Sequence, residues 1–250
     1  MCRLLGVVSS RRATVSELLA NDLGPFANLA CEHPDGWGIG HVGPTDRVLI
    51  TKEPGRADRS SRFSSLVNWT MTDAALLHLR LASKDLAVTA ANTHPFGNDG
   101  EAFAHNGFFT PTGAIDEDLG ADLVASAGGD TDSERFYLAV RSRIEGGLSP
   151  ARALAEAGAL VRAAAAEWVS LNCLYLTPQA MFAYADHHPD SEVIRRRGPG
   201  FFDLGYRVEP SKVVIASSGW SPPGGGWIPL PERHVLEVRR HDLRTTIHES

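Results

Sequence analysis

The sequence begins Met1-Cys2-Arg3-Leu4-Leu5-Gly6-Val7-Val8, and the interpretation of the whole chain depends on this stretch. Residues 2–8 are apolar at nearly every position, which predicts a strand buried on both faces. The small side chain of Cys2 permits removal of Met1, after which Cys2 would carry a thiol and a free α-amine. An amine with a pKa near ~8 beside a thiol is a nucleophile with its own base. The alternative is that Cys2 is a small apolar residue that starts a buried strand.

The composition is typical of a globular protein and excludes several classes of function. The chain has 250 residues, of which 43% are hydrophobic and 22% charged, and we expect one domain over residues 1–250 (mature chain 2–250). Its net charge of −6 favours neither a nucleic acid nor an anionic membrane as a partner. No apolar run reaches the ~18–20 residues of a membrane span, and no signal-peptide pattern precedes Cys2.

The cysteines and histidines predict neither a disulfide framework nor a metal site. Cys2, Cys31 and Cys173 are odd in number and form no Cys-x-x-Cys pair. The 10 histidines match no metal-binding spacing, so we expect no metal and no cofactor. A reducing, cytoplasmic location suits a reactive thiol.

Two stretches of the first hundred residues carry unusual polar or glycine-rich patterns. The segment His33-Pro34-Asp35-Gly36-Trp37-Gly38-Ile39-Gly40 predicts backbone pressed against another backbone or a ligand, followed by a hairpin partner over residues 47–52. Residues 74–82 predict a strand with His78 and Arg80 on one face and leucines on the other. That polar face is either functional or the solvent side of an edge strand.

A polar turn over residues 92–96, which includes His94, precedes a short strand over 102–105 that leads into Asn106-Gly107. An Asn-Gly pair is normally a hairpin turn. The functional alternative is an oxyanion hole made by an asparagine amide and a glycine N–H.

The remaining elements predict strands, then two long helices, then strands, which indicates an α+β layered fold. Thr131 and Glu134 fit a capping box that begins a helix ending near Ile144, and Asp132 there suits a helix start. The other expected elements are helices over 15–19 (capped by Thr14), 61–69 and 151–169, a hairpin of 171–177 with 180–185, strands over 212–217 and a final 235–239, and loops at 195–197 and 222–226.

Taken in order, these segments resemble the glutaminase domain of class II glutamine amidotransferases, which are N-terminal-nucleophile hydrolases. The resemblance is carried by Met1-Cys2 and the following strand, His33-Pro34-Asp35-Gly36-Trp37-Gly38, His78-Leu79-Arg80-Leu81-Ala82, Asn92-Thr93-His94-Pro95-Phe96, Ala104-His105-Asn106-Gly107 and Thr131-Asp132-Ser133-Glu134. The Asp-Gly-Trp-Gly form is similar to stand-alone members, one branch of which cleaves a γ-glutamyl amide in ergothioneine biosynthesis.

The resemblance implies a four-layer αββα sandwich and a role for each residue. Cys2 would attack a γ-glutamyl amide with its α-amine as the base, and Asn106 with Gly107 would hold the oxyanion. Arg80 would bind the substrate α-carboxylate and Asp132 the α-ammonium. Secondary candidates for substrate contact are His78, His94, His105 and Trp37.

The resemblance is incomplete after Arg80, where amidotransferases that make amino sugars or purines carry a Trp and a Thr-His. Here those places hold Leu81 and Ser83-Lys84, so the leaving group accepted can differ. No synthase domain is expected within residues 1–250. We expect either a separate chain that accepts the ammonia or a simple amidohydrolase without an acceptor. The oligomeric state is left open. The alternative from another class is a catalytically silent glutamyl-binding or regulatory domain.

Overall fold

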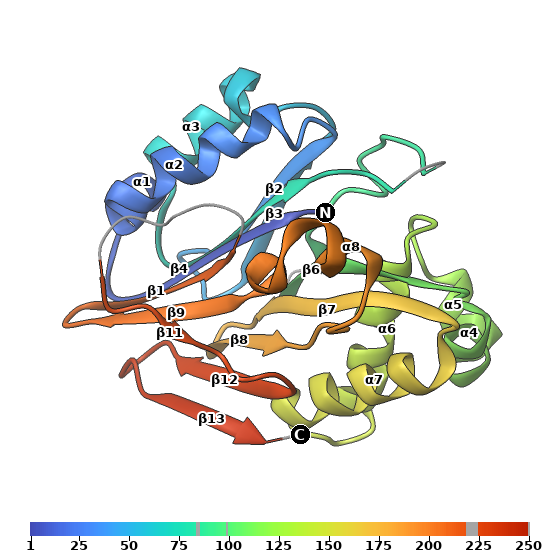
Figure 1. The fold of residues 1–250 in the computed structure, drawn as a ribbon. Coiled ribbons are helices and arrows are strands. Elements are labelled where there is room, and N and C mark those ends of the chain that lie inside the picture. The colour runs from blue at the N-terminus through green and yellow to red at the C-terminus, as the bar shows by residue number, and fades with distance from the viewer. Residues whose placement is uncertain (84–85, 99, 219–224, 250) are drawn as a thin grey trace.

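The protein is built from two antiparallel sheets packed face to face and covered by helices on both outer sides (Figure 1). The computed structural model describes residues 1–83, 86–98, 100–218 and 225–249. The expected α+β fold with four αββα layers is confirmed.

The first sheet carries the N-terminal strand at its centre. In spatial order it contains β11 (Ile228–Pro229), β9 (Leu204–Glu209), β10 (Lys212–Ser217), β1 (Arg3–Thr14), β4 (Met71–Arg80), β2 (Gly36–Val42) and β3 (Val48–Glu53). Because β1 lies between β10 and β4, its apolar run is buried on both faces, as the sequence predicts.

The second sheet is formed mainly by later parts of the chain. In spatial order it contains β13 (Thr245–Glu249), β12 (His234–Arg239), β8 (Ala180–Ala185), β7 (Glu167–Leu176), β6 (Glu101–Thr110) and β5 (Phe96–Asn98). The strand over 235–239 is therefore confirmed, but it is not the final strand, because β13 pairs with it.

Helices cover the outer face of each sheet. The first sheet is covered by α1 (Val15–Leu19), α2 (Leu23–Asn28) and α3 (Ser61–Trp69), and short 3₁₀ turns lie at Ala20–Asp22, Leu29–Cys31 and Ala57–Arg59. The second sheet is covered by α4 (Gly113–Leu119), α5 (Ala121–Ala125), α6 (Asp132–Glu145) and α7 (Pro150–Ala164). Thr14 caps α1 with a complete capping box, as expected.

Two expected elements differ from the structure, each for its own reason. The alanine-rich helix expected over 151–169 ends at Ala164, because residues 167–176 pair with β6 as strand β7. Residues 195–197, expected as a loop, form the last turn of α8 (Glu192–Arg197), which a 3₁₀ turn at Pro199–Phe202 follows. In the first place tertiary pairing overrides the local pattern, whereas in the second the Ser191 side chain caps the helix locally by accepting from the N–H of Ile194. The loop expected at 222–226 lies partly outside the described residues.

The core has three layers, one between the sheets and one under each helical layer. Strand alternation sorts the residues: Leu4 and Leu76 point between the sheets, whereas Leu5 and Leu77 point toward α1–α3. Gly38 is required where β2 passes the loop before β5, because a Cβ there would overlap the carbonyl oxygen of His94. The backbone contact expected from the glycine-rich segment is therefore confirmed.

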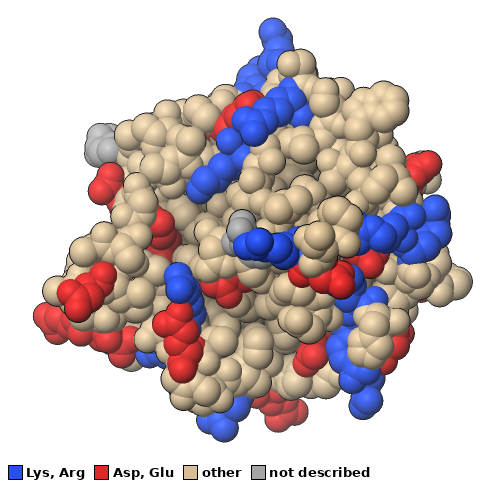
Figure 2. Space-filling view, turned by 180° about the vertical axis from the view of Figure 1, so that it is seen from behind, with Lys and Arg blue, Asp and Glu red and all other residues tan. Residues whose placement is uncertain are grey.

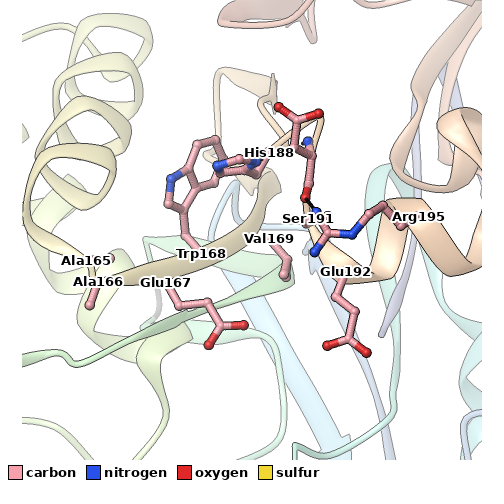
Figure 3. A pocket seen from close by; sticks show the side chains of 10 residues that line it. Ala165, Ala166, Glu167, Trp168, Val169, His188, Ser191, Glu192 and Arg195 are labelled. Carbon is pink, nitrogen blue, oxygen red and sulfur yellow. Dashed lines mark hydrogen bonds between the residues drawn. The ribbon is translucent and has the colours of Figure 1, made fainter.

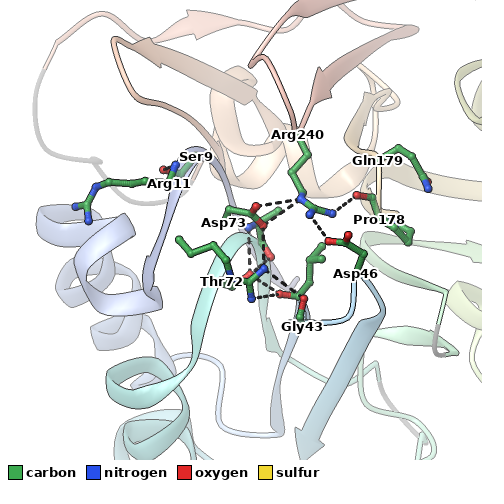
Figure 4. A network of polar contacts seen from close by, with 12 residues as sticks. Ser9, Arg11, Gly43, Asp46, Thr72, Asp73, Pro178, Gln179 and Arg240 are labelled. Carbon is green, nitrogen blue, oxygen red and sulfur yellow. Dashed lines mark hydrogen bonds and ion pairs between the residues drawn. The ribbon is translucent and has the colours of Figure 1, made fainter.

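A polar cluster around Arg240 ties the two sheets together at one end (Figure 4). The Arg240 guanidinium donates to Asp46 of the β2–β3 turn, to Asp73 of β4 (Nε, 3.1 Å) and to the carbonyl of Pro178 in the β7–β8 turn. Within the part of the chain that the structure describes, none of the helices has both the length and the apolar character needed to cross a bilayer.

Candidate active site at the amino terminus

Cys2 lies at the start of β1 and is almost fully buried. Only 7% of the residue is exposed, and its Sγ donates to the carbonyl of Leu81 at 3.7 Å. The antiparallel register pairs Arg3 with Leu79, so Cys2 lies opposite Arg80 at the end of β4. Because alternate residues share a face, the Cys2 side chain is on the same face as Leu4, which belongs to the core between the sheets.

Arg80 and His78 occupy the same inner face of β4, in line with Leu76. The strand lies between β1 and β2, and all its residues from Ala74 to Arg80 are buried, so the edge-strand alternative is wrong. The guanidinium of Arg80 donates to the carbonyl of Ala87 through both Nη1 and Nη2, each at 3.3 Å.

Asn106 lies on the facing sheet, at an interior position of β6. The strand continues through Asn106 and Gly107 to Thr110, so the hairpin-turn alternative is wrong. Asn106 shares its face with Ala102 and Ala104, which point between the sheets. Its amide is fully buried, and neither Nδ2 nor Oδ1 has a hydrogen-bond partner among the described residues. A buried amide without a partner is a costly arrangement that a substrate oxygen could relieve.

Asp132 is the first residue of α6 and is held beside β6. Its Oδ2 accepts from the backbone N–H of Phe109 at 2.9 Å. Burial raises the pKa of this carboxyl, and the nearby His105 and the N–H of Phe109 oppose the shift. Thr131 caps the helix as expected, but Glu134 does not complete the capping box, because its carboxylate accepts instead from the N–H groups of Gly128 and Gly129.

The three histidine candidates fall into two environments. His105 points toward α6, where Nε2 donates to the carbonyl of Ser170 and Nδ1 lies 2.9 Å from the Ser133 hydroxyl. His78 and His94 stack with ring centroids 4.1 Å apart, and burial lowers the pKa of both well below the usual value. Burial lowers the pKa of His105 as well, so all three imidazoles are neutral at neutral pH.

Trp37 does not belong to the inner face. It is fully buried on the helical side of β2 and packs edge to face on Phe63 of α3, with ring centroids 5.2 Å apart. Its neighbour Gly36 pairs with Arg80, and alternation turns the Trp37 side chain the other way. The expectation that Trp37 contacts substrate is therefore wrong.

Residues near Phe201 pack beside the N-terminus, a contact that no local sequence pattern predicts. The ring of Phe201 lies between two guanidinium groups, Arg3 at 4.9 Å and Arg197 at 5.0 Å. Met1 packs beside the same segment, in a small apolar cluster with Val169 and Ile194. Arg3 and Phe201 lie far apart along the chain, so no local pattern could have paired them.

Burial controls the protonation of the N-terminal groups. It raises the pKa of the Cys2 thiol, and the positive N-terminus, the Leu81 carbonyl contact, Arg80 and Arg3 partly offset that effect. It also lowers the pKa of the Met1 amine. Both shifts belong to the chain that retains Met1, and they show that burial favours the neutral forms of the amine and the thiol at this end of the chain.

Several surface hollows lie away from these residues. One of about 330 Å³ lies between the start of β7 and α8, and Trp168, His188 and Arg195 line it (Figure 3). Its wall includes Val169, which also packs beside Met1, but not Cys2, Arg80, Asn106 or Asp132. On the face shown in Figure 2, basic and acidic side chains are interspersed.

Solved structures support the fold. Glutamine phosphoribosylpyrophosphate amidotransferase from B. subtilis aligns with a TM-score of 0.66 and 15% identity over 99% of this chain, which spans 49% of that protein. A class-II glutamine aminotransferase domain protein from Silicibacter pomeroyi aligns with a TM-score of 0.68 and 16% identity over 99% of both chains. An allosteric regulatory enzyme of purine biosynthesis aligns with a TM-score of 0.71 and 16% identity over 99% of this chain and 49% of that one.

A comparison with curated protein sequences gives no match. The family model of class-II glutamine amidotransferases, however, matches residues 1–204, which is most of the chain and includes every candidate residue from Cys2 to Asp132. Together with the two-sheet fold and the cysteine at position 2, this match establishes that the chain belongs to the class-II glutamine amidotransferases.

Proposed function

We propose that the mature chain, beginning at Cys2, hydrolyses the γ-amide of glutamine or of a γ-glutamyl conjugate through a γ-glutamyl thioester. The observation that carries the proposal is the arrangement of three buried groups. Cys2 and Arg80 lie side by side on the inner face of one sheet, and Asn106 lies on the inner face of the other with an amide that has no partner among the described residues.

The reaction begins at the Cys2 sulfur. The free α-amine of the mature chain accepts the thiol proton, the thiolate attacks the amide carbon, and the C–N bond breaks as the amine returns that proton to the leaving nitrogen. Water then cleaves the thioester, which releases glutamate and frees the thiol. The Asn106 Nδ2 and the Gly107 N–H stabilise the oxyanion of both tetrahedral intermediates.

The opposite charges of Arg80 and Asp132 bind the glutamyl head group. Arg80 binds the α-carboxylate, a task for which a planar guanidinium with parallel donors is suited. Asp132 pairs with the α-ammonium, and the N–H of Phe109 keeps one of its oxygens oriented. His78 and His94 support the pocket as neutral groups.

The leaving group is ammonia or an amine, and its fate is part of the proposal. The B. subtilis relative is about twice as long as this chain, which spans 49% of it. Transfer of the ammonia to an acceptor would make the protein an amidotransferase, whereas release into solvent would make it a simple amidohydrolase.

A catalytically silent glutamyl-binding domain is the second candidate, and the packing of Met1 favours it. Met1 contributes to an apolar cluster with Val169, Ile194 and Phe202. While Met1 is retained, the nitrogen of Cys2 is an amide with no basic lone pair, so glutamine could bind without being cleaved.

The experiment that separates the two candidates follows Cys2 directly. Intact-mass measurement shows whether Met1 is removed, and 6-diazo-5-oxo-L-norleucine, a glutamine analogue with an electrophilic carbon, is expected to label Cys2 of the processed protein. Cys2→Ala should abolish amide hydrolysis, whereas Cys31→Ala, which removes an exposed thiol, should not change it. Full activity in Cys2→Ala would end the proposal.

A further inference from the structure

Asn92 is a buried residue whose side chain joins two segments of the candidate site. It lies in the turn before β5 and is only 2% exposed. Its Nδ2 donates to the carbonyl of Ala87 at 3.2 Å, and its Oδ1 accepts from the N–H of Asp130 at 2.9 Å. The amide nitrogen and the amide oxygen of Asn92 therefore bond two different segments of the chain.

The first segment leads to Arg80. The carbonyl of Ala87 accepts from Asn92 and from both terminal nitrogens of Arg80. Three donors therefore converge on one carbonyl oxygen, and the position of that oxygen fixes the orientation of the guanidinium.

The second segment leads to Asp132. Asp130 precedes it by two residues, and the segment is held again by Glu134, whose carboxylate accepts from the N–H groups of Gly128 and Gly129. Gly129 is packed so closely that a Cβ there would overlap Oδ1 of Asn92. The start of α6 is therefore built against the Asn92 amide.

We infer that Asn92 is a positioning residue that sets the separation between Arg80 and Asp132, and so determines selectivity for the α-amino-acid head group of the substrate. The inference rests on the proposed function, in which these two residues bind the α-carboxylate and the α-ammonium. The Asn92 side chain bonds Ala87 and Asp130 rather than Cys2, and it has no proposed contact with the scissile amide. Its loss should weaken recognition of the head group and leave the chemistry of the thiol intact.

The test compares two electrophiles that react with the same sulfur. The labelling of Cys2 is followed by peptide mass spectrometry with 6-diazo-5-oxo-L-norleucine, which has the α-amino and α-carboxyl groups, and with iodoacetamide, which has neither. In Asn92→Ala, we expect the first rate to fall roughly 10–100-fold, as for the loss of one or two hydrogen bonds, and the second to stay unchanged. The KM for glutamine should rise in parallel while kcat is retained.

Two further variants make the result specific. Asn92→Asp keeps an oxygen for the Asp130 N–H but cannot donate to Ala87, so it should lose the same selectivity even if the alanine variant is poorly folded. Asn68→Ala removes an exposed asparagine amide on α3, which bonds only the Ser64 carbonyl, and should behave as wild type.

The outcomes distinguish this inference from the proposed function. A wild-type protein that shows no preference for the glutamine analogue would overturn both. The role of Asn92 alone would be overturned if the wild type prefers the glutamine analogue and the Asn92 variants either keep that preference or lose both labelling rates equally.

Discussion

Arg80 directs both terminal nitrogens of its guanidinium at one acceptor, the carbonyl oxygen of Ala87, at 3.3 Å each. A single neutral oxygen satisfies this two-pronged donor poorly. A carboxylate offers two charged oxygens and forms shorter, stronger bonds with it. Because each of these nitrogens carries a second N–H, the guanidinium could bind the α-carboxylate of a substrate while the Ala87 carbonyl holds its orientation.

The first prediction concerns the geometry of Arg80. Arg80→Lys keeps the positive charge but replaces two parallel donors with one ammonium group. We expect the KM for glutamine to rise about 10–100-fold, because charged hydrogen bonds contribute roughly 1.5–3 kcal/mol. Steady-state kinetics measure the change, and an unaltered KM would exclude Arg80 from head-group binding.

The second prediction uses the unusual state of Asn106. Asn106→Ala should lower kcat by about 10²–10³, as the loss of one oxyanion donor does in other enzymes. The Asn106 amide makes no hydrogen bond with the described residues. Its removal therefore breaks no hydrogen bond among them, and the melting temperature should not fall. A large loss of stability with normal kcat would instead assign Asn106 a structural role.

Local sequence patterns predicted those parts of the fold that are determined locally. The boundaries of α1 and α3 agree with the predicted ranges, and each helix follows a residue whose side chain caps it, Thr14 for α1 and Ser60 for α3. The antiparallel pairing of β2 with β3 follows from a turn pattern. The inner-face positions of His78 and Arg80 follow from the two-residue period of a strand once β4 is placed inside the sheet.

Long-range contacts set the features that the sequence left open. The Asn106-Gly107 pair is a strong turn signal, yet β7 pairs with both residues and the strand continues through them. Trp37 and Gly36 alternate across β2, and only the burial of Gly36 opposite Arg80 shows which of them faces inward. The role of Asn92 depends on Ala87 and Asp130, whose positions relative to one another no local pattern indicates.

The third prediction concerns the pH dependence of Asp132. Burial raises the pKa of this carboxyl, so its ionised form destabilises the folded state once the pH exceeds the unfolded pKa. Asp132→Asn should therefore raise the melting temperature at neutral pH, and this gain should vanish as the pH falls through the folded pKa toward the unfolded value. Calorimetric scans between acidic and neutral pH measure the gain.

The same substitution should have the opposite effect on activity. Asn cannot pair with the α-ammonium as a carboxylate does, so kcat/KM for glutamine should fall. The wild-type kcat/KM should decline on the acid side as Asp132 is protonated, at a pH above that of an ordinary aspartate. If this acid limb persists unchanged in Asp132→Asn, another group produces it.

The fourth prediction tests the junction between the sheets, far from the chemistry. Arg240 is mostly buried and bonds Asp46 in the β2–β3 turn, Asp73 in strand β4 and the Pro178 carbonyl in the β7–β8 turn (Figure 4). Arg240→Met keeps much of the apolar stem but leaves two carboxylates without their shared cation. Because charged hydrogen bonds contribute about 1.5–3 kcal/mol, and solvent screens part of the interaction with the exposed Asp46, we expect a loss near the lower end of that range. For a chain of this length, that corresponds to a fall of about 3–6 °C in melting temperature. Arg239, the residue before Arg240, forms a more exposed ion pair with Asp242. Arg239→Met therefore serves as the matched control and should change the melting temperature little. Glutamine hydrolysis at low temperature should stay normal in both variants, and a selective loss of activity in Arg240→Met would mean that the junction also controls the geometry at Cys2.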